Sequence, residues 1–257
     1  MTVRDVYEII DRLAPFSAAL DWDNSGLQVG DWSARVDRVL VALDATPQVL
    51  EEAAGTGAQL VVTHHPLLFE PVRQLAAPHP AFLAARLGVA VLSAHTNYDL
   101  APRGVNAQLA AALGLADTEP LPDVGGAEPP VGLVGNLPKE ASTRALAQAL
   151  EGVLGVRPRY NPLDRTIRRV ALCGGAGADF VAAGQAAGCH AFLTGEAKHH
   201  QFLDAHARGI VLFDGTHYAT EALAMPFLAD YLRTHCPGAT VELARAYDGL
   251  VVDRSEK

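Results

Sequence analysis

Residues 59–66 read Gln-Leu-Val-Val-Thr-His-His-Pro, a short apolar run that ends in two adjacent histidines and a proline. An uninterrupted apolar run of this length is typical of a strand that is buried on both faces of a parallel sheet. Pro66 favours an extended or turn conformation at His65, so the strand should run into a fixed loop. The stretch therefore predicts a buried parallel strand that carries two imidazoles at its carboxyl end.

Similar apolar runs recur along the chain and alternate with helix-like segments rich in alanine and leucine. Together with the first run, the expected strands are 38–43, 59–63, 89–93, 169–173, 191–194 and 209–213. The expected helices are 3–13, with Thr2 as N-cap, 47–54, 80–87, 103–113, 142–154, 178–187 and 198–207. Because strands alternate with helices, the pattern predicts an α/β fold with mostly parallel sheets.

The composition restricts the class of protein. The chain has 257 residues, of which 49% are hydrophobic and 19% charged, so it can bury a large core. Its net charge of −9 argues against a nucleic-acid partner, since phosphate binding needs clustered lysine and arginine. Three scattered cysteines do not form a disulfide framework. We see neither an apolar signal region nor a membrane span, and we expect a cytoplasmic protein.

One stretch, 117–130, reads as a linker because it is rich in proline, glycine and acidic residues and has no period. It predicts an N-terminal α/β lobe over residues 1–125 and a second α/β lobe over 126–257. The C-terminal tail of the second lobe is free to pack back on the first lobe.

The two halves resemble each other. Residues 38–43 are similar to 169–174, and residues 91–98 are similar to 211–218, in the same order. Chance would give some likeness, because all such units are rich in valine, leucine and alanine. Two matches that each end in polar residues favour a duplication. We therefore expect two similar, interlinked lobes, with a cleft outside the carboxyl ends of their strands.

Polar clusters follow the expected strands of the first half. His64 and His65 are neighbours, and on an extended chain their rings point to opposite sides and would reach different ions. The same pair is also compatible with two core histidines. His95 and Asp99 follow the next strand, where Asp99 has the alternative role of capping the helix at 103–113.

The second half offers two further clusters. His217 and Glu221 lie four residues apart at the opening of a helical pattern that runs to about Leu232, so they share one helix face. They predict a chelate, although surface pairs with this spacing are frequent. Glu196 is a candidate general base, and Lys198 or His199 could meet a phosphate at a helix N-terminus. Ordinary capping and a polar helix face explain those three residues equally well.

Taken together, the clusters contain more ligands than one tetrahedral zinc site uses. Three imidazoles and two carboxylates suit two neighbouring divalent ions, with zinc, manganese, iron, nickel or cobalt as the metals that this ligand set favours. The predicted metal ligands are His64, His65, Asp99, His217 and Glu221.

These motifs, in this order, resemble the Nif-three-like family, the GTP cyclohydrolase I type 2 homologues. The matching stretches cover almost the whole chain and are 23–30, 63–66, 95–99, 173–177, 194–196, 199–200 and 215–221. The chain lacks the domain that longer members insert between the halves. It also has Glu196 at a position that is often aspartate.

The resemblance implies two similar lobes with a dinuclear metal site in the cleft between them, and the same five ligands, with Glu221 shared by both ions. It further implies a toroidal homohexamer, a trimer of dimers whose sites face an internal cavity. The implied reaction is hydrolytic opening of the guanine ring of GTP, in which a metal-activated water attacks C8. In that reaction His95, Glu196 or His199 would transfer protons, and a metal or Lys198 would contact the charged substrate.

Two other functions remain open at this stage. One is a different metal-dependent hydrolase that acts on phosphoesters or amides. The other is a non-catalytic metal-binding scaffold in which the ring itself matters. The segment 23–30 also has two interpretations, because Asp23 and Asn24 could cap a turn or orient a ligand histidine, and Trp22 and Trp32 could pack this segment or serve an interface.

Overall fold

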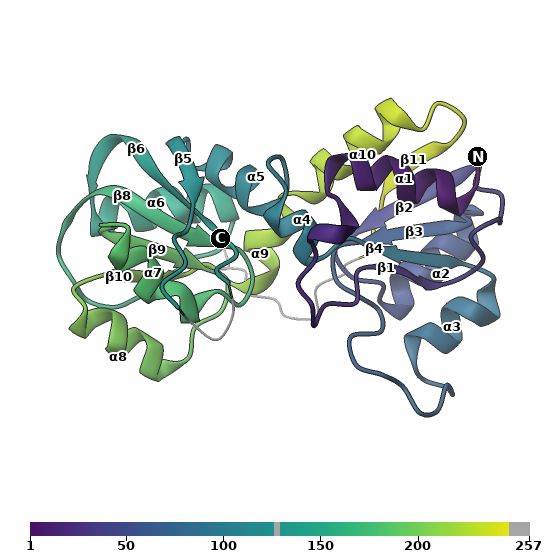
Figure 1. The fold of residues 1–257 in the computed structure, drawn as a ribbon, viewed down its shortest axis with the longest axis horizontal. Helices are drawn as coiled ribbons and strands as arrows, with labels where there is room; N and C mark the ends of the chain where they lie inside the picture. Colours follow the sequence, from purple (N-terminus) through teal and green to yellow (C-terminus); the bar gives the residue numbers. More distant parts are fainter. Residues whose placement is uncertain (126–128, 247–257) are drawn as a thin grey trace. The chain divides into compact units, whose positions relative to one another are not determined.

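The computed structural model describes residues 1–125 and 129–246, which form two compact units. The first unit comprises Met1–Gly104 and the described residues from Ala224 onward, and the second runs from Val105 to Leu223. Each unit contains one β-sheet with helices around it (Figure 1). The α/β class expected from the sequence is therefore confirmed.

The first sheet has the order β1-β4-β3-β2-β11 and is parallel except for β1, which runs antiparallel to β4. Its strands are β1 (Gly26–Val29), β2 (Arg38–Ala42), β3 (Leu60–Thr63), β4 (Ala90–Ser93) and β11 (Thr240–Leu243). The helices of this unit are α1 (Val3–Leu13), η1 (Phe16–Ala18), α2 (Pro47–Thr56), α3 (Pro80–Leu87), α4 (Thr96–Leu100) and α10 (Met225–His235).

Alternation along the strands of the first sheet divides their side chains between two layers of helices. Leu40, Val61 and Val91 belong to one buried cluster with residues of α2 and α3. The neighbouring positions point to the other face, where α1 and α10 pack together (Figure 1). Thr2 caps α1 in a capping box with Asp5, as the sequence predicted.

The second sheet has the order β5-β6-β8-β9-β10-β7. Its strands are β5 (Ala116–Pro120), β6 (Leu133–Ser142), β7 (Arg159–Tyr160), β8 (Thr166–Cys173), β9 (Ala191–Thr194) and β10 (Val211–Asp214). The helices are α5 (Val105–Ala112), α6 (Thr143–Leu154), η2 (Ala178–Phe180), α7 (Val181–Ala186), α8 (His199–Ala207) and α9 (His217–Ala222).

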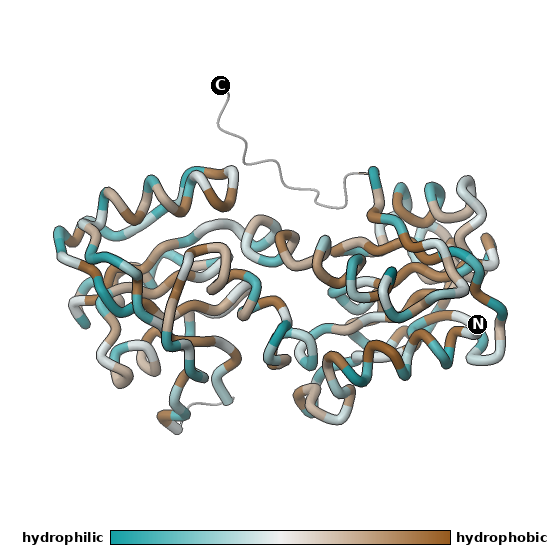
Figure 2. Tube along the Cα trace, turned by 90° about the horizontal axis from the view of Figure 1, so that it is seen from above, coloured by the Kyte–Doolittle hydropathy of each residue, from teal (hydrophilic) through white to brown (hydrophobic). Residues whose placement is uncertain are grey.

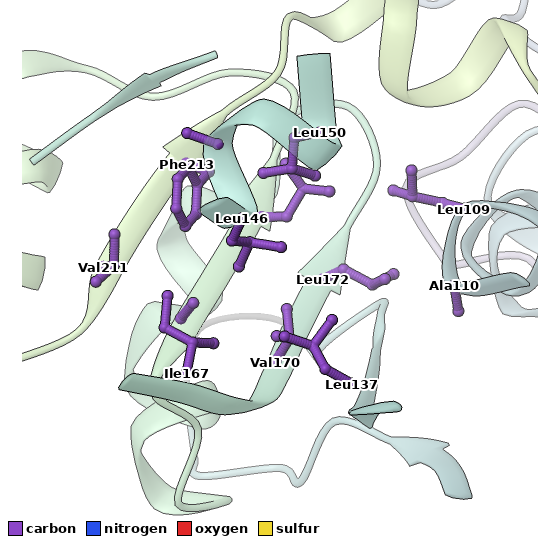
Figure 3. Packing of buried hydrophobic residues seen from close by; sticks show 13 residues of the cluster. Leu109, Ala110, Leu137, Leu146, Leu150, Ile167, Val170, Leu172, Val211 and Phe213 are labelled. Atoms are coloured by element: carbon purple, nitrogen blue, oxygen red, sulfur yellow. The ribbon is translucent and has the colours of Figure 1, made fainter. Parts of the chain in front are cut away.

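The core of the second unit lies between its sheet and the helices α5 and α6 (Figure 3). Leu146 and Leu150 of α6 pack against Ile167 of β8 and Phe213 of β10, and all four side chains are buried. Figure 2 shows the same division in each unit, with apolar strands inside and helices that alternate between apolar and polar residues.

The prediction of mostly parallel sheets holds for the first sheet and is wrong for the second. Only β8, β9 and β10 run parallel there, while β5, β6 and β7 pair antiparallel with their neighbours. All residues of β5 are exposed, so no apolar pattern marks it. Its bounds include the start of the stretch expected to be a linker, 117–130, of which 126–128 lie outside the described residues.

The two units also divide the chain at other places than the expected boundary between residues 125 and 126. The chain leaves the first unit after Gly104 and returns to it at Ala224. The reason is that β11 pairs with β2 and α10 packs on α1, while α5 packs on β6 and β8. Residues 247–257 of the expected C-terminal tail lie outside the described residues.

The strands that resemble each other in sequence occupy matching places in the two sheets. In the first sheet β2, β3 and β4 are adjacent and parallel, and β1 lies antiparallel beside β4. In the second, β8, β9 and β10 are adjacent and parallel, and β7 lies antiparallel beside β10. Each unit thus repeats the same four-stranded arrangement.

Two expected helical features differ in the structure. The helix expected from His217 to about Leu232 is two helices, α9 and α10, because Pro226 at the start of α10 cannot donate a hydrogen bond to the preceding turn. Asp99 lies inside the short helix α4, ahead of α5. Within the described residues, none of the helices has the length and apolar character that would be required to cross a membrane.

Candidate metal centre

Three histidines converge at the carboxyl ends of two neighbouring strands in the first unit. His64 and His65 follow β3, and His95 follows β4. One ring nitrogen from each of these side chains lies within 4.8 Å of the others. Three imidazole nitrogens at this separation are suited to hold a transition-metal ion.

Carboxylates fix the orientation of two of these rings. The Nδ1 atom of His65 lies 2.7 Å from Oδ1 of Asp44, and Nδ1 of His95 lies 2.8 Å from Oδ1 of Asp23. An ionised carboxylate only accepts hydrogen bonds, so each histidine carries its proton on Nδ1. The Nε2 lone pairs are then available to a metal, as in the carboxylate–histidine pairs of metalloproteins.

His64 is oriented by the backbone instead. Its side chain is fully buried, and its Nδ1 lies 3.0 Å from the carbonyl oxygen of Ala94, which selects the same tautomer. The Nε2 atom lies 3.6 Å from Oδ1 of Asp99. Asp99 therefore joins the histidine cluster of its own unit as an additional oxygen donor.

The sequence argument that His64 and His65 point to opposite sides is wrong. The β3 strand ends at Thr63, and the two histidines lie in a bend with ring centroids 5.0 Å apart. The hydroxyls of Thr63 and Ser93 lie 2.8 and 3.1 Å from the carbonyl oxygen of His65 and hold this bend. Both rings can therefore face the same centre.

The segment that contains Asp23 supports His95 and α4 together. Oδ2 of Asp23 accepts hydrogen bonds from the backbone and the hydroxyl of Thr96, at 3.1 and 2.6 Å. Ser25 accepts a hydrogen bond from the backbone N–H of His95 at 3.1 Å. Burial raises the pKa of Asp23, but the hydrogen bonds from His95 and Thr96 outweigh it and hold the pKa well below its usual range. Of the two sequence interpretations, the geometry supports orientation of a histidine.

In the second unit, His217 lies between two carboxylates. Its Nδ1 is 3.2 Å from Oε2 of Glu196, and its Nε2 is 3.1 Å from Oε2 of Glu221. The side chain of Glu221 is only 4% exposed, whereas those of His217 and Glu196 are 39% and 61% exposed. His217 and Glu221 thus share one helix face, as the spacing predicted, and Glu196 orients the ring.

Two glycines bring the backbone close to this pair. Gly175 has φ +61°, and a Cβ atom there would lie 2.1 Å from Oε1 of Glu221 and 3.1 Å from Nε2 of His217. At Gly195, a Cβ atom would lie 2.7 Å from the Cα atom of His217. The place of the Glu221 carboxylate therefore depends on the absence of a side chain at Gly175, and that of the His217 backbone on the absence of one at Gly195.

The residue before His217 is strained. Thr216 has φ 65°, a conformation that β-branched residues rarely adopt. Its backbone N–H donates to Oδ1 of Asp214 at 3.0 Å, and its hydroxyl caps α9 by accepting from Ala219. Asp214 also forms an ion pair with Arg159. Strain of this kind is common at functional sites, where the surroundings hold it in place.

The predicted site residues thus fall into two groups, each in its own unit. His64, His65, His95 and Asp99 lie together in the first, and Glu196, His217 and Glu221 lie together in the second. His199 begins α8 with an exposed side chain, and Lys198 is its N-cap residue. Sequence reasoning missed Asp44, although this carboxylate follows the expected strand 38–43 directly and so ends at the same sheet edge.

The donor set of the two groups fits divalent transition metals. It consists of imidazole nitrogens and carboxylate oxygens, the ligands that zinc, manganese, iron, nickel and cobalt accept. The three described cysteines are buried and belong to neither group. The ligand atoms of His64, His65 and His95 lie close enough together to hold one ion.

Comparison with known proteins gives consistent matches. The chain matches the model of the family described as Duf34/NIF3 (NGG1p interacting factor 3) over residues 1–247. It is 38% identical over 206 residues to a GTP cyclohydrolase 1 type 2 homolog of Nostoc sp., which covers 77% of this chain and 78% of that relative. A protein of the same name from Streptomyces coelicolor is 36% identical over 230 residues, covering 84% and 80%.

A solved structure agrees with the fold. The Bacillus cereus protein related to NIF3 superposes with a TM-score of 0.90 and covers 98% of this chain and 99% of its own. The two sequences are 20% identical, so this similarity concerns the fold alone.

Proposed function

This chain belongs to the Duf34/NIF3 family, and we propose that it is a metal-dependent hydrolase that opens the ring of a purine nucleotide such as GTP. The names of its relatives support the reaction class, since they are called GTP cyclohydrolase 1 type 2 homologs. The residues themselves support the requirement for metal.

One observation carries the proposal. All three histidines of the first unit have Nδ1 next to an oxygen acceptor, so all three present Nε2 as a ligand atom. A set of core histidines would not need the same tautomer in every ring. Common orientation of imidazoles by oxygen acceptors is the arrangement found around protein-bound metals.

We propose that the two groups of residues together bind two divalent ions. The ligands are His64, His65 and Asp99 from the first unit and His217 and Glu221 from the second, and the orientation of His95 adds its Nε2 to the first group. Both groups follow strands at the carboxyl edge of a parallel arrangement, where ligands bind in open α/β sheets. The buried carboxylate of Glu221 has two oxygens, which suits it to contact both ions.

When bound, the ions would act as Lewis acids and lower the pKa of a coordinated water so that it becomes a nucleophile at neutral pH. The chain supplies orientation and proton positions. Asp44 and Asp23 keep the protons of His65 and His95 on Nδ1. Glu196 lies 3.2 Å from Nδ1 of His217, so we propose that Glu196 positions this ligand.

The reaction is tested by loading the purified protein with Mn²⁺ or Zn²⁺, incubating it with GTP and measuring released formate. We expect formate release that a chelator abolishes and that returned metal restores. A protein that retains its metal and releases no formate contradicts the proposed reaction. A parallel panel of phosphoester and amide substrates would then identify a different hydrolase, and no turnover of any substrate would leave metal binding as its activity.

A further inference from the structure

Two large aromatic side chains stand exposed beside the histidine group of the first unit. Trp22 is 46% exposed and Phe69 is 54% exposed. Their ring centroids lie 5.8 Å apart, and each lies 6.1 Å from the ring of His95, which is nearly perpendicular to both. Because the two rings are neighbours, they form an exposed apolar patch, the kind of surface that marks a binding site.

The backbone that carries these rings is braced by polar side chains. Nδ2 of Asn24 donates to the carbonyl oxygen of Leu68 at 2.6 Å, and the N–H of Leu68 donates to Oε1 of Gln28 at 3.2 Å. The two side chains are also bonded to each other, at 3.1 Å. Both backbone groups of the residue before Phe69 are thereby tied to the segment that follows Trp22.

The same segment is tied to His95. Asp23, the residue after Trp22, holds Nδ1 of His95 at 2.8 Å. One short stretch therefore sets the position of an imidazole and of two exposed rings at the same time. Residues 23–28 thus help to position all three rings, and the side chains of Asp23, Asn24 and Gln28 make the hydrogen bonds that do so.

We propose that Trp22 and Phe69 form a stacking site for the planar heteroaromatic ring of a small-molecule ligand. This inference rests on the proposed function, since it places the ring of the substrate next to His95 and the other histidines. Aromatic side chains stack on any such ring through their faces, and a braced backbone lowers the cost of ordering on binding.

A position beside the histidine group favours a small ligand over a second copy of the chain. Two rings on a fixed backbone offer the area of one heterocycle, whereas a stable interface between proteins needs far more buried surface. The perpendicular ring of His95 closes the third side, so a ring stacked on Phe69 or Trp22 would present its edge to this imidazole.

The test compares binding of GTP, guanosine, adenosine and inorganic triphosphate to the zinc-loaded protein by calorimetry. For Trp22→Ala and Phe69→Ala we expect roughly 5- to 150-fold weaker binding of the three ligands that contain a ring. Binding of inorganic triphosphate should not change. Phe69→Tyr should retain ring binding, while Phe69→Leu, which keeps apolar area without a π face, should not.

A matched control is Leu203→Ala, which removes another exposed apolar side chain, 58% exposed, from α8 in the second unit. It should leave all affinities unchanged. In a Trp32→Phe background Trp22 is the remaining tryptophan, so quenching of its fluorescence by guanosine gives a second readout that needs no metal chemistry.

The results separate this inference from the proposed reaction. Ring-dependent binding without formate release supports the stacking site and contradicts the reaction. Formate release with unchanged ring affinity in Trp22→Ala and Phe69→Ala overturns the stacking site alone. A wild-type protein that binds none of the ring-containing ligands overturns it too. The stacking site is also overturned if Trp22→Ala and Phe69→Ala change the molecular mass in light scattering but leave ring binding unchanged. That result would show that the two rings lie in an interface between copies of the chain.

Discussion

The two groups of candidate ligands hold their histidines in different ways. In the first unit, His65 and His95 are oriented by Asp44 and Asp23, and the buried ring of His64 by a backbone carbonyl. In the second unit, the partly exposed ring of His217 contacts Glu196 and the buried Glu221. The first group depends on hydrogen-bond partners, whereas the second depends on free space beside Gly175 and on a strained Thr216.

This difference determines which substitutions damage each group. In the first unit the loss of an oxygen acceptor should loosen a ring. In the second unit an added side chain should displace a carboxylate. In the first unit, substitutions that weaken metal binding should therefore also lower the stability of the fold. In the second unit, metal binding should be lost with little loss of stability.

The largest difference is expected between His64→Ala and His217→Ala. Each substitution should abolish binding of the metal ion that the histidine contacts, because a ligand is lost. His64 is fully buried and its loss leaves the carbonyl of Ala94 without its donor, so metal-free His64→Ala should lose about 1–3 kcal/mol of unfolding free energy. His217 is partly exposed, so metal-free His217→Ala should lose less unfolding free energy than metal-free His64→Ala.

Urea unfolding in the presence of a chelator measures the unfolding free energy of the metal-free variants. Mass spectrometry of the metal-loaded variants measures the loss of bound metal. Equal losses of stability in the two metal-free variants would contradict the distinction between a buried and an exposed histidine.

Gly175→Ala should weaken metal binding through a steric clash. Its Cβ would lie 2.1 Å from Oε1 of Glu221, so the carboxylate must move and metal binding should fall strongly. Gly188→Ala is the matched control, since Gly188 has a similar positive φ of 72° and no atom within 4 Å of a built Cβ. Both variants carry the backbone cost of about 1–2 kcal/mol. Thermal unfolding and metal titration should show destabilisation of both variants but retained metal only in the control, and retained metal in Gly175→Ala would refute the close-packing argument.

Removal of the orienting carboxylates should give an intermediate effect. Asp44→Ala and Asp23→Ala should each weaken metal binding by about 10- to 100-fold, the usual cost of losing the partner of a ligand histidine. Glu196→Ala should cost less, because Glu196 is mostly exposed and its contact of 3.2 Å is longer. Competition with a coloured chelator measures these affinities, with Asp37→Ala, an exposed carboxylate paired to Arg35, as control. A larger loss in Glu196→Ala than in Asp44→Ala would reverse the comparison.

The smallest effect is expected for the reactivity of two buried cysteines. Burial raises the pKa of Cys236 in the first unit and of Cys189 in the second to about 11. Because only the thiolate reacts, alkylation of these thiols at pH 8 should be slow in the folded protein and should rise with pH up to about 11. Mass spectrometry with and without denaturant compares the two positions. Fast labelling of the folded protein at pH 8 would contradict their burial.

The predictable part of the fold consists of elements with a strong local pattern. The apolar runs 38–43, 59–63 and 191–194 correspond to β2, β3 and β9 almost residue for residue, because strands buried on both faces must be apolar throughout. β5 and β7 could not be found this way, since their residues are exposed and the neighbouring strand determines their position. The sequence also could not show that α5 belongs to the second unit and α10 to the first, because tertiary packing decides this.

The site was predictable as far as residue type and strand ends determine it. Histidines directly after strands pointed to His64 and His95, and the four-residue spacing on one helix face pointed to His217 and Glu221. The partners of these residues were less accessible, since one aspartate after a strand, such as Asp44, is a common feature. The φ of Thr216 leaves no trace in the sequence at all, because it depends on contacts of Asp214 and the surrounding loops.

The most direct test of the account is the metal content of Glu221→Gln, which keeps the size of the buried side chain but removes its charge. Glu242→Gln, at a partly exposed ion pair with Arg38, serves as control. With equal metal supply, we predict two ions per chain in the wild type and the control, and loss of both in Glu221→Gln. Wild-type metal content in Glu221→Gln would contradict the proposed site as a whole.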